Sequence, residues 1–189
     1  MFKIAFTATL LAFFAPLEAK SETLSQLRGR YVIEASSEIG FLVSQLGGGG
    51  VKGSFRRFSG IFNLMPGNTA RSSVTFSLEP ASVETGQTRV EDFLKSSAVF
   101  SAREHPLIRF RSTRVRQDGP DSAIIEGVLT ARGITRRETF HAKLAGWQGR
   151  NVRFQVTGDI LRSPYGMDVG TPIYADRVHF EMTLTGKRK

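Results

Sequence analysis

The chain has 189 residues, of which 40% are hydrophobic and 23% are charged, and it contains no cysteine. These fractions are typical of one folded domain and exclude a disordered or fibrous protein. The lack of cysteine excludes disulfide scaffolds, thiol nucleophiles, iron–sulfur clusters and thiolate zinc sites. There are 26 lysines and arginines against 17 aspartates and glutamates, so the formal net charge is +9.

The amino-terminal residues follow the three-part pattern of a secretory signal peptide. Lys3 supplies a positive charge, Ile4–Phe14 is apolar apart from two threonines, and Ala19 is a small residue at the expected cleavage site. This apolar run is too short to cross ~30 Å of hydrocarbon as a helix. We therefore expect residues 1–19 to be removed and residues 20–189 to form one domain, in the periplasm or outside the cell.

Period-two alternation of apolar and polar residues dominates the rest of the chain. It predicts antiparallel strands with one apolar face and one polar face. The clearest segments are 39–43, 74–78, 108–110, 140–144, 152–160 and 178–184. Between Val51 and Leu64 the parity changes near Arg56 and Arg57, which indicates either a β-bulge in one strand or two strands joined at a corner.

One segment, Gln87–Lys95, breaks this alternation. Its apolar residues Val90, Phe93 and Leu94 have the spacing i, i+3 and i+4, which predicts one short amphipathic helix. About eight strands with a single helix predict an all-β sandwich or barrel. An eight-stranded barrel is wide enough either to be filled by side chains or to hold one small ligand, and the alternation does not decide between these two states.

The search for catalytic or metal-binding patterns gives little. The three histidines, His105, His141 and His179, form no HxxxH or HxH pair beside a carboxylate, so no metal site is expected. Nucleophile-elbow, phosphate-loop and dinucleotide-binding patterns are missing, and the scattered carboxylates do not point to an acid–base pair. The sequence therefore favours binding over catalysis, with no catalytic residue and no cofactor.

The positive charge has three interpretations. Basic residues gather in the segments 103–116, 132–137 and 187–189, and composition alone makes nucleic acid the first partner to consider. Export argues for anionic membrane surfaces instead, and most aromatic residues that could stack on bases have the inward parity. We expect no nucleic-acid partner, we leave an anionic membrane surface open, and the simplest interpretation is a solvated basic outer face.

Short motifs then follow one another along the chain in a specific order. They are Tyr31–Glu34, Ser37–Val43 with Leu46-Gly47, Val51–Phe55 with Phe58 and Gly60, Ala81–Gly86, Leu94–Ser96, His105–Phe110 with Ser112, Gly127–Thr130 with Gly133–Thr135, and Ile160–Met167. Each motif alone is weak, but together and in this order they resemble the YceI-like family over essentially the whole mature chain. The sequence departs from the family pattern at Ser36, Gln45, Phe93, Ala98-Val99 and Pro164-Tyr165, where several polar groups are missing.

The resemblance implies an elongated, eight-stranded, antiparallel, lipocalin-like barrel that holds a polyisoprenoid or a similar long lipid, such as an isoprenoid quinone, without enzymatic activity. Burial of apolar ligand surface, at roughly 25 cal/mol per Å², would supply the affinity. The candidate lining residues, each of which has plain core packing as its alternative role, are Phe41, Val43, Phe55, Phe58, Phe62, Phe76, Phe93, Leu94, Phe110, Phe154 and Phe180.

A polar or anionic head group would lie near the helix, which we expect to cover one mouth of the barrel. The candidate head-group residues are Arg89, Lys95, Arg162 and Tyr165, because guanidinium and ammonium groups favour phosphate. Three hypotheses remain: a lipid carrier or scavenger, a module with a packed interior that binds polyanions or membrane surfaces, and an enzyme acting on lipids. The sequence does not set the oligomeric state, and a dimer remains open.

Overall fold

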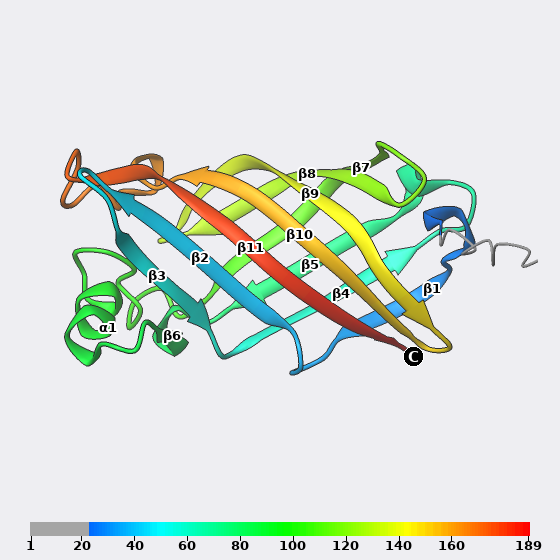
Figure 1. The fold of residues 1–189 in the computed structure, drawn as a ribbon, viewed down its shortest axis with the longest axis horizontal. Helices are drawn as coiled ribbons and strands as arrows, with labels where there is room; N and C mark the ends of the chain where they lie inside the picture. Colours follow the sequence, from blue (N-terminus) through cyan, green and yellow to red (C-terminus); the bar gives the residue numbers. More distant parts are fainter. Residues whose placement is uncertain (1–22) are drawn as a thin grey trace, which may run out of the picture.

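The computed structural model describes residues 23–189, and strands account for most of them (Figure 1). The strands are β1 (Gly29–Ile33), β2 (Glu38–Gln45), β3 (Gly50–Phe55), β4 (Phe58–Leu64), β5 (Ser73–Leu78), β6 (Val83–Glu84), β7 (Ile108–Gln117), β8 (Ser122–Ala131), β9 (Ile134–Gln148), β10 (Asn151–Leu161) and β11 (Tyr174–Arg188). The helices are α1 (Thr88–Lys95) and four short 3₁₀ turns, η1 (Leu24–Gln26), η2 (Thr69–Arg71), η3 (Pro80–Ser82) and η4 (Ser163–Tyr165). The predicted signal peptide lies outside the described residues.

Eight of these strands close into a ring. Their order is β1-β4-β5-β7-β8-β9-β10-β11, and the pairing of β1 with β11 completes the circle. All pairings are antiparallel. The long strand β11 pairs with β1 through its last residues and with β2 through its first residues, so β2 continues the line of β1. The structure thus confirms the predicted eight-stranded antiparallel barrel with one short α-helix.

The parity change between Val51 and Leu64 is a corner between two strands. The backbone N–H of Arg56 donates to the carbonyl oxygen of Ser82 at 3.1 Å, and that of Arg57 donates to the Ser82 hydroxyl at 2.9 Å. These two donors bond outside the β-ladder, so β3 ends and β4 begins on either side of them. Of the two readings, the β-bulge is therefore wrong and the corner is correct.

The predicted alternation is present in the walls. Along β10 the side chains of Val152, Phe154, Val156 and Ile160 are buried, whereas their neighbours on the strand are exposed or half-buried. The predicted helix Gln87–Lys95 is confirmed as α1, one residue shorter at its start. No helix within residues 23–189 is long and apolar enough to cross a membrane.

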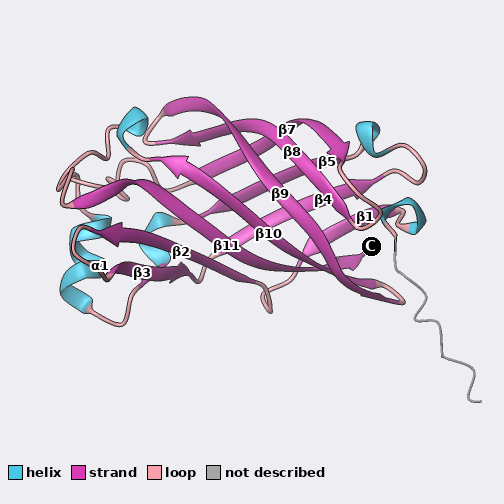
Figure 2. Cartoon of the chain, turned by 45° about the horizontal axis from the view of Figure 1, so that its top comes forward, coloured by secondary structure: helices cyan, strands magenta, loops and turns pink. Residues whose placement is uncertain are grey.

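The two ends of the barrel differ in construction (Figure 2). At one end, here called the η1 end, the backbone N–H of Leu24 in η1 donates to the carbonyl oxygen of Pro120, between β7 and β8, at 2.9 Å. Leu27, next to η1, is 0% exposed. At the other end, here called the α1 end, β6 pairs with β3 and with no other described strand, and α1 is the next element along the chain. Helix α1 therefore completes the wall at a place where the sheet stops.

Candidate functional site

The interior of the barrel holds a cavity of about 550 Å³. Its lining begins at the η1 end with Leu24 and Leu27 and reaches the α1 end at Phe93 and Leu94. Between these ends almost all lining side chains are apolar. The volume falls within the range of about 300–1,000 Å³ that is usual for small-ligand sites. The hypothesis of a packed interior is therefore wrong.

Glycines opposite phenylalanines help to keep the space open. A Cβ atom built on Gly186 would lie 2.5 Å from two ring atoms of Phe62, and one built on Gly158 would clash with the ring of Phe140. Each ring therefore lies against the barrel wall, over a glycine that has no side chain to push it away. This Gly–Phe pairing gives a physical reason why a barrel rich in phenylalanine is not filled by it.

The structure places ten of the predicted lining residues at the cavity. These are Phe41, Val43, Phe55, Phe62, Phe76, Phe93, Leu94, Phe110, Phe154 and Phe180. The prediction was wrong for Phe58, which lies outside the lining, with its ring 6.3 Å from that of Phe76. Phe58 is the first residue after the corner at Arg56 and Arg57, where the wall changes direction and its side chain reaches a second, outer pocket beside Ile33.

Several lining residues were missed by the sequence reasoning. Some are inward-facing wall residues of the strands, such as Ile125, Val156 and Met182. Others come from η1 and the residue after it, from the segment after α1, and from the loop before β11 and its first residue; they include Leu24, Leu27, Val99, Phe100, Met167, Val169 and Tyr174. Leu24 and Leu27 have a spacing of three, which is a usable signal for a turn that covers a barrel end. Val99, Phe100, Met167 and Val169 lie in irregular segments, where period-two reasoning does not apply.

Arg162, a predicted head-group residue, is only 7% exposed and stabilises the loop between β10 and β11. Its acceptors are the carbonyl oxygens of Met167, Val169 (2.9 Å), Tyr174 (3.1 Å) and Ala175 (3.0 Å) and the hydroxyl of Thr171 (2.8 Å). These bonds use all five N–H groups of the guanidinium. Arg162 thus lines the cavity with a buried positive charge but has no N–H left to donate to a head group.

Tyr165 is completely buried and its ring also lines the cavity. Its hydroxyl donates to Oε1 of Glu138 at 2.7 Å. Burial raises the pKa of Glu138, and the hydrogen bond from Tyr165 acts in the opposite direction. Burial and the neighbouring carboxylate both raise the pKa of Tyr165. The hydroxyl is therefore already engaged and the phenol stays protonated.

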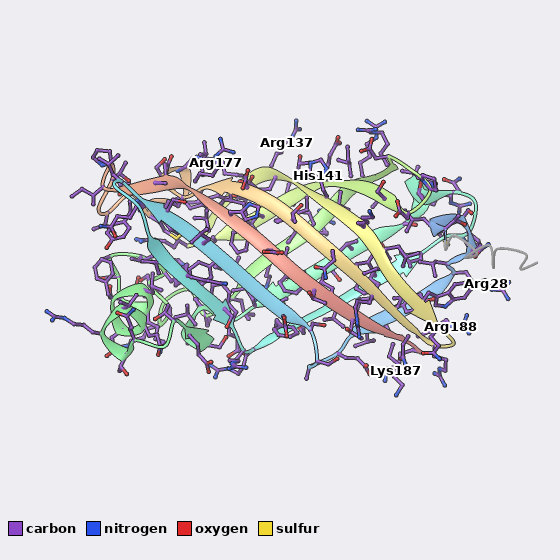
Figure 3. All side chains as sticks on the ribbon, viewed as in Figure 1. Arg28, Arg137, His141, Arg177, Lys187 and Arg188 are labelled. Atoms are coloured by element: carbon purple, nitrogen blue, oxygen red, sulfur yellow. The ribbon has the colours of Figure 1, made fainter. Side chains whose placement is uncertain are left out.

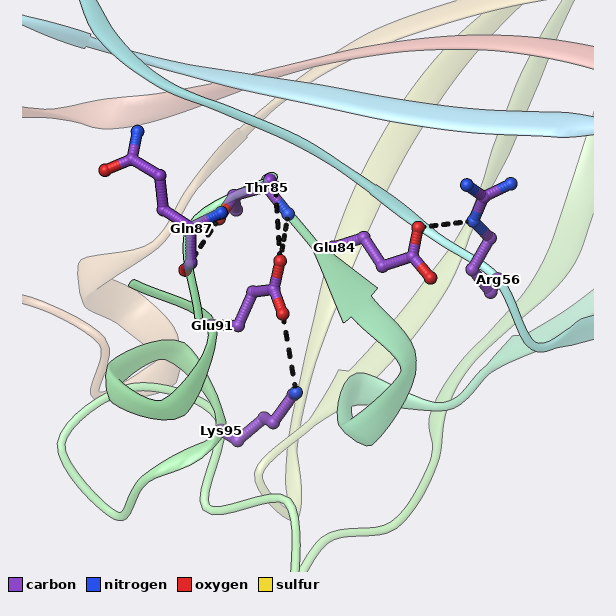
Figure 4. A network of polar contacts seen from close by, with 7 residues as sticks. Arg56, Glu84, Thr85, Gln87, Glu91 and Lys95 are labelled. Atoms are coloured by element: carbon purple, nitrogen blue, oxygen red, sulfur yellow. Dashed lines mark hydrogen bonds and ion pairs between the residues drawn. The ribbon is translucent and has the colours of Figure 1, made fainter. Parts of the chain in front are cut away.

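The remaining two head-group candidates lie on α1 and behave differently. Arg89 is exposed and lines the cavity, and no hydrogen bond or ion pair within residues 23–189 engages its guanidinium. Lys95 does not line the cavity, and its Nζ lies 4.0 Å from Glu91 (Figure 4). Of the predicted head-group residues, only Arg89 is thus placed at the cavity with free donors.

The start of α1 is held by Glu91 (Figure 4). Its carboxylate accepts hydrogen bonds from the backbone N–H groups of Thr85, at 2.8 Å, and Gly86, at 3.1 Å. These bonds, that from Thr85 most, lower the pKa of Glu91. A single carboxylate therefore ties the helix that completes the wall to the chain leaving β6.

Exposed apolar side chains gather at the α1 end. Phe93 is 48% exposed and Val169 is 39% exposed, yet both also line the cavity. Leu46 and Ile173 are exposed on neighbouring loops, which are joined by a hydrogen bond of 2.8 Å from the Leu46 N–H to the Ile173 carbonyl. The apolar lining is therefore continuous with the outer surface at this end.

Within residues 23–189 no group of three or more His, Asp and Glu side chains is arranged to hold a metal ion. His179 pairs instead with Asp159, with 2.8 Å between Nδ1 and Oδ1, on the outer face of the barrel. No histidine or carboxylate within the described part of the chain belongs to the cavity lining. The described arrangement offers a ligand apolar contact and one free guanidinium.

Comparison with known proteins gives a family match and related sequences. The family model described as "YceI-like domain" matches residues 31–186. Protein YceI of Escherichia coli is 32% identical over a stretch covering 65% of this chain and 66% of that protein. A UPF0312 protein of Vibrio cholerae is 29% identical over 84% of this chain and 87% of its own length.

Solved structures show the same fold at lower identity. BcnA of Burkholderia cenocepacia superposes with a TM-score of 0.75 at 23% identity, covering 81% of this chain and 98% of that chain. A polyisoprenoid binding domain from Saccharophagus degradans, implicated in plant cell wall breakdown, superposes with a TM-score of 0.69 at 12% identity, covering 86% of this chain and all (100%) of that domain. These likenesses support the barrel fold.

Proposed function

The chain belongs to the YceI-like family, and from that premise we propose that it binds a long apolar lipid, a polyisoprenoid or an isoprenoid quinone, inside its barrel. The observation that carries the proposal is the apolar cavity of about 550 Å³ that reaches from η1 to α1. The polyisoprenoid binding of the Saccharophagus degradans domain, which has the same fold, supports this ligand class.

The lining suits a ligand with little polar surface. Burying apolar surface stabilises a complex by roughly 25 cal/mol per Å², so an isoprenoid chain needs few directional contacts. The free guanidinium of Arg89 on α1 is placed to meet a polar or anionic end group, since such groups pair well with arginine. The apolar side chains of Phe93 and Val169 offer the path between the cavity and the outside.

The proposed role is that of an exported carrier or scavenger rather than an enzyme. The described lining contains no acid–base pair that a hydrolytic or transfer reaction would need. The signal-like sequence at the amino terminus supports location in the periplasm or outside the cell. The non-catalytic role and the location outside the cytoplasm are both part of the proposal.

The test is mass spectrometry of organic extracts from natively purified protein, comparing the natural chain with a cavity variant. Ala142→Phe adds a ring inside the cavity, because Ala142 is buried in its lining. His141→Phe is the matched control, because His141 is exposed on the same strand. We expect an isoprenoid-type lipid from the natural chain and from the control, and at least a tenfold smaller amount from Ala142→Phe.

A second cavity variant, Ala123→Phe, keeps the test usable if Ala142→Phe does not fold. Ala123 pairs with Ala142 on the neighbouring strand, so a ring there would fill the same part of the cavity. Circular dichroism checks that each variant folds. Repeatedly empty extracts, together with no uptake of added polyisoprenoid, would overturn the proposal. Equal lipid in the folded cavity variants would place the lipid elsewhere and would also contradict it.

A further inference from the structure

Five basic side chains that do not line the cavity lie close together at one end of the barrel. Arg28, Arg30, Arg150, Lys187 and Arg188 come from three separate parts of the sequence and meet at the η1 end. Figure 3 shows Arg28, Lys187 and Arg188 at this end of the barrel. We refer to these five residues as the basic end cluster.

Strand pairing and backbone contacts bring the cluster together. Lys187 is paired with Val32 of β1 on one side and with Asn151 of β10 on the other. The guanidinium of Arg150 donates to the carbonyl oxygen of Arg188 at 2.7 and 3.0 Å. Arg30, Lys187 and Arg188 are therefore on the paired strands β1 and β11. Arg28 directly precedes β1, and Arg150 lies in the turn before β10.

Positive charge is in excess at the cluster. None of its members takes part in an ion pair within residues 23–189. The residues paired with Lys187 and Arg188 are uncharged. One carboxylate is near, that of Glu34, which follows β1 and whose backbone N–H donates to the carbonyl oxygen of Thr185 at 2.8 Å. Four of the cations are exposed and Arg188 is half-buried. Like charges held together without partners repel one another, which favours an external anion as their counterpart.

We propose that the basic end cluster binds the barrel, η1 end first, to a membrane surface rich in anionic lipid. A flat array of phosphate head groups can meet all of these cations at once. Met65, between β4 and β5, lies at the same end; its side chain lines the cavity and is also 42% exposed. An exposed apolar side chain beside cations suits the interface of a bilayer better than a nucleic acid. This inference is independent of the ligand in the cavity.

The test uses co-sedimentation of the purified protein with vesicles. Phosphatidylglycerol mixed with phosphatidylcholine provides the anionic surface, and pure phosphatidylcholine provides the neutral one. The end variant carries Arg28→Gln, Arg30→Gln and Lys187→Gln. Each cation near an anionic surface contributes about fivefold to binding, so we expect its partition onto anionic vesicles to fall on the order of 100-fold.

The matched control removes the same charge from the side wall, where Arg137 is visible in Figure 3. It carries Arg109→Gln, Arg111→Gln and Arg137→Gln, all exposed positions on β7 and β9. We expect it to lose less than about threefold, and binding of the natural chain to weaken steeply as salt is added. Circular dichroism and the lipid content of the barrel should be unchanged in both variants.

Three results would overturn the proposal. Equal losses in the two triple variants would show that binding follows net charge rather than the cluster. Equal partition onto neutral and anionic vesicles would exclude charge as the cause. Tighter binding to heparin than to anionic vesicles would identify a soluble polyanion as the partner. Because lipid extraction is measured separately, none of these results bears on the proposed cavity ligand.

Discussion

The two ends of the barrel are stabilised by different means. At the α1 end, irregular loops are held by side-chain hydrogen bonds, chiefly those of Arg162 and Glu91. At the η1 end, tight turns, close packing around Tyr31 and Phe62 and the buried Leu27 hold the structure. Exposed apolar residues that also line the cavity are Phe93 and Val169 at the α1 end and Met65 at the η1 end. The η1 end also carries the basic end cluster.

This difference assigns the two ends different tasks. A wall completed by a short helix and a braced loop can open locally without breaking the β-ladder, because few backbone pairs depend on it. An end built from paired strands holds its charges in fixed positions. We infer that ligand exchange belongs to the α1 end and surface contact to the η1 end.

The largest expected effect tests the bracing of the α1 end. Arg162→Met would leave several buried acceptors without donors, each costing about 1–3 kcal/mol, so the free energy of unfolding should fall by at least about 3 kcal/mol. Amide exchange of the loop residues 167–173 should rise first. Urea denaturation and hydrogen exchange measure the two effects.

The control for this prediction is Arg177→Met, which removes an exposed arginine paired with Asp159 at the same end. An exposed ion pair contributes at most about 1 kcal/mol, so this variant should unfold almost like the natural chain. Equal destabilisation by both substitutions would show that the buried hydrogen bonds of Arg162 do not hold the loop.

A smaller effect tests the packing of the η1 end. Gly186→Ala would push against Phe62, and overpacking of this kind costs about 1–3 kcal/mol. Gly146→Ala is the control, because a Cβ there meets nothing within 4 Å. Thermal unfolding should separate the two variants, and indistinguishable melting temperatures would contradict close packing at this end.

The smallest effect is a pH dependence of α1. The pKa of Glu91 is lower in the folded chain than its ordinary value of 4.5, so its stabilising effect is present above that value and is lost as pH falls through the lowered pKa. Amide exchange of Thr88–Lys95 should therefore increase on acidification. In Glu91→Gln it should already be faster at neutral pH and change less with acid.

Asp92→Asn provides the comparison for α1, since the carboxylate of Asp92 makes no hydrogen bond within residues 23–189. This variant should keep the pH response of the natural chain. If the pH dependence of amide exchange disappeared in Asp92→Asn and persisted in Glu91→Gln, then Asp92 would be its cause. That result would contradict the proposed role of Glu91 in holding α1 to the chain after β6.

Much of the regular structure could be predicted from the sequence. Alternation along β10 and β11 identified their inward faces correctly, because one side of each strand must avoid water. The spacing of Val90, Phe93 and Leu94 identified α1 for a similar reason. These signals are local, so they can be read without knowing which strands are neighbours.

The predictions were wrong where contacts with residues distant in the sequence determine the position of a side chain. Phe58 has the right parity but follows the corner created by the bonds of Arg56 and Arg57 to Ser82. Arg162 looked free to meet a ligand, but its acceptors lie in a loop whose path the sequence does not fix. Whether the barrel was hollow could not be predicted either, because it depends on which glycine lies opposite which phenylalanine across two strands.

The Gly–Phe pairs determine how easily a mutation could abolish ligand binding. A Cβ atom at position 158 would clash with the ring of Phe140, so a larger residue there would have to displace this ring. We expect one such substitution to reduce the room for a ligand without a change of fold. Glycines at these positions are a better guide to occupancy than overall similarity.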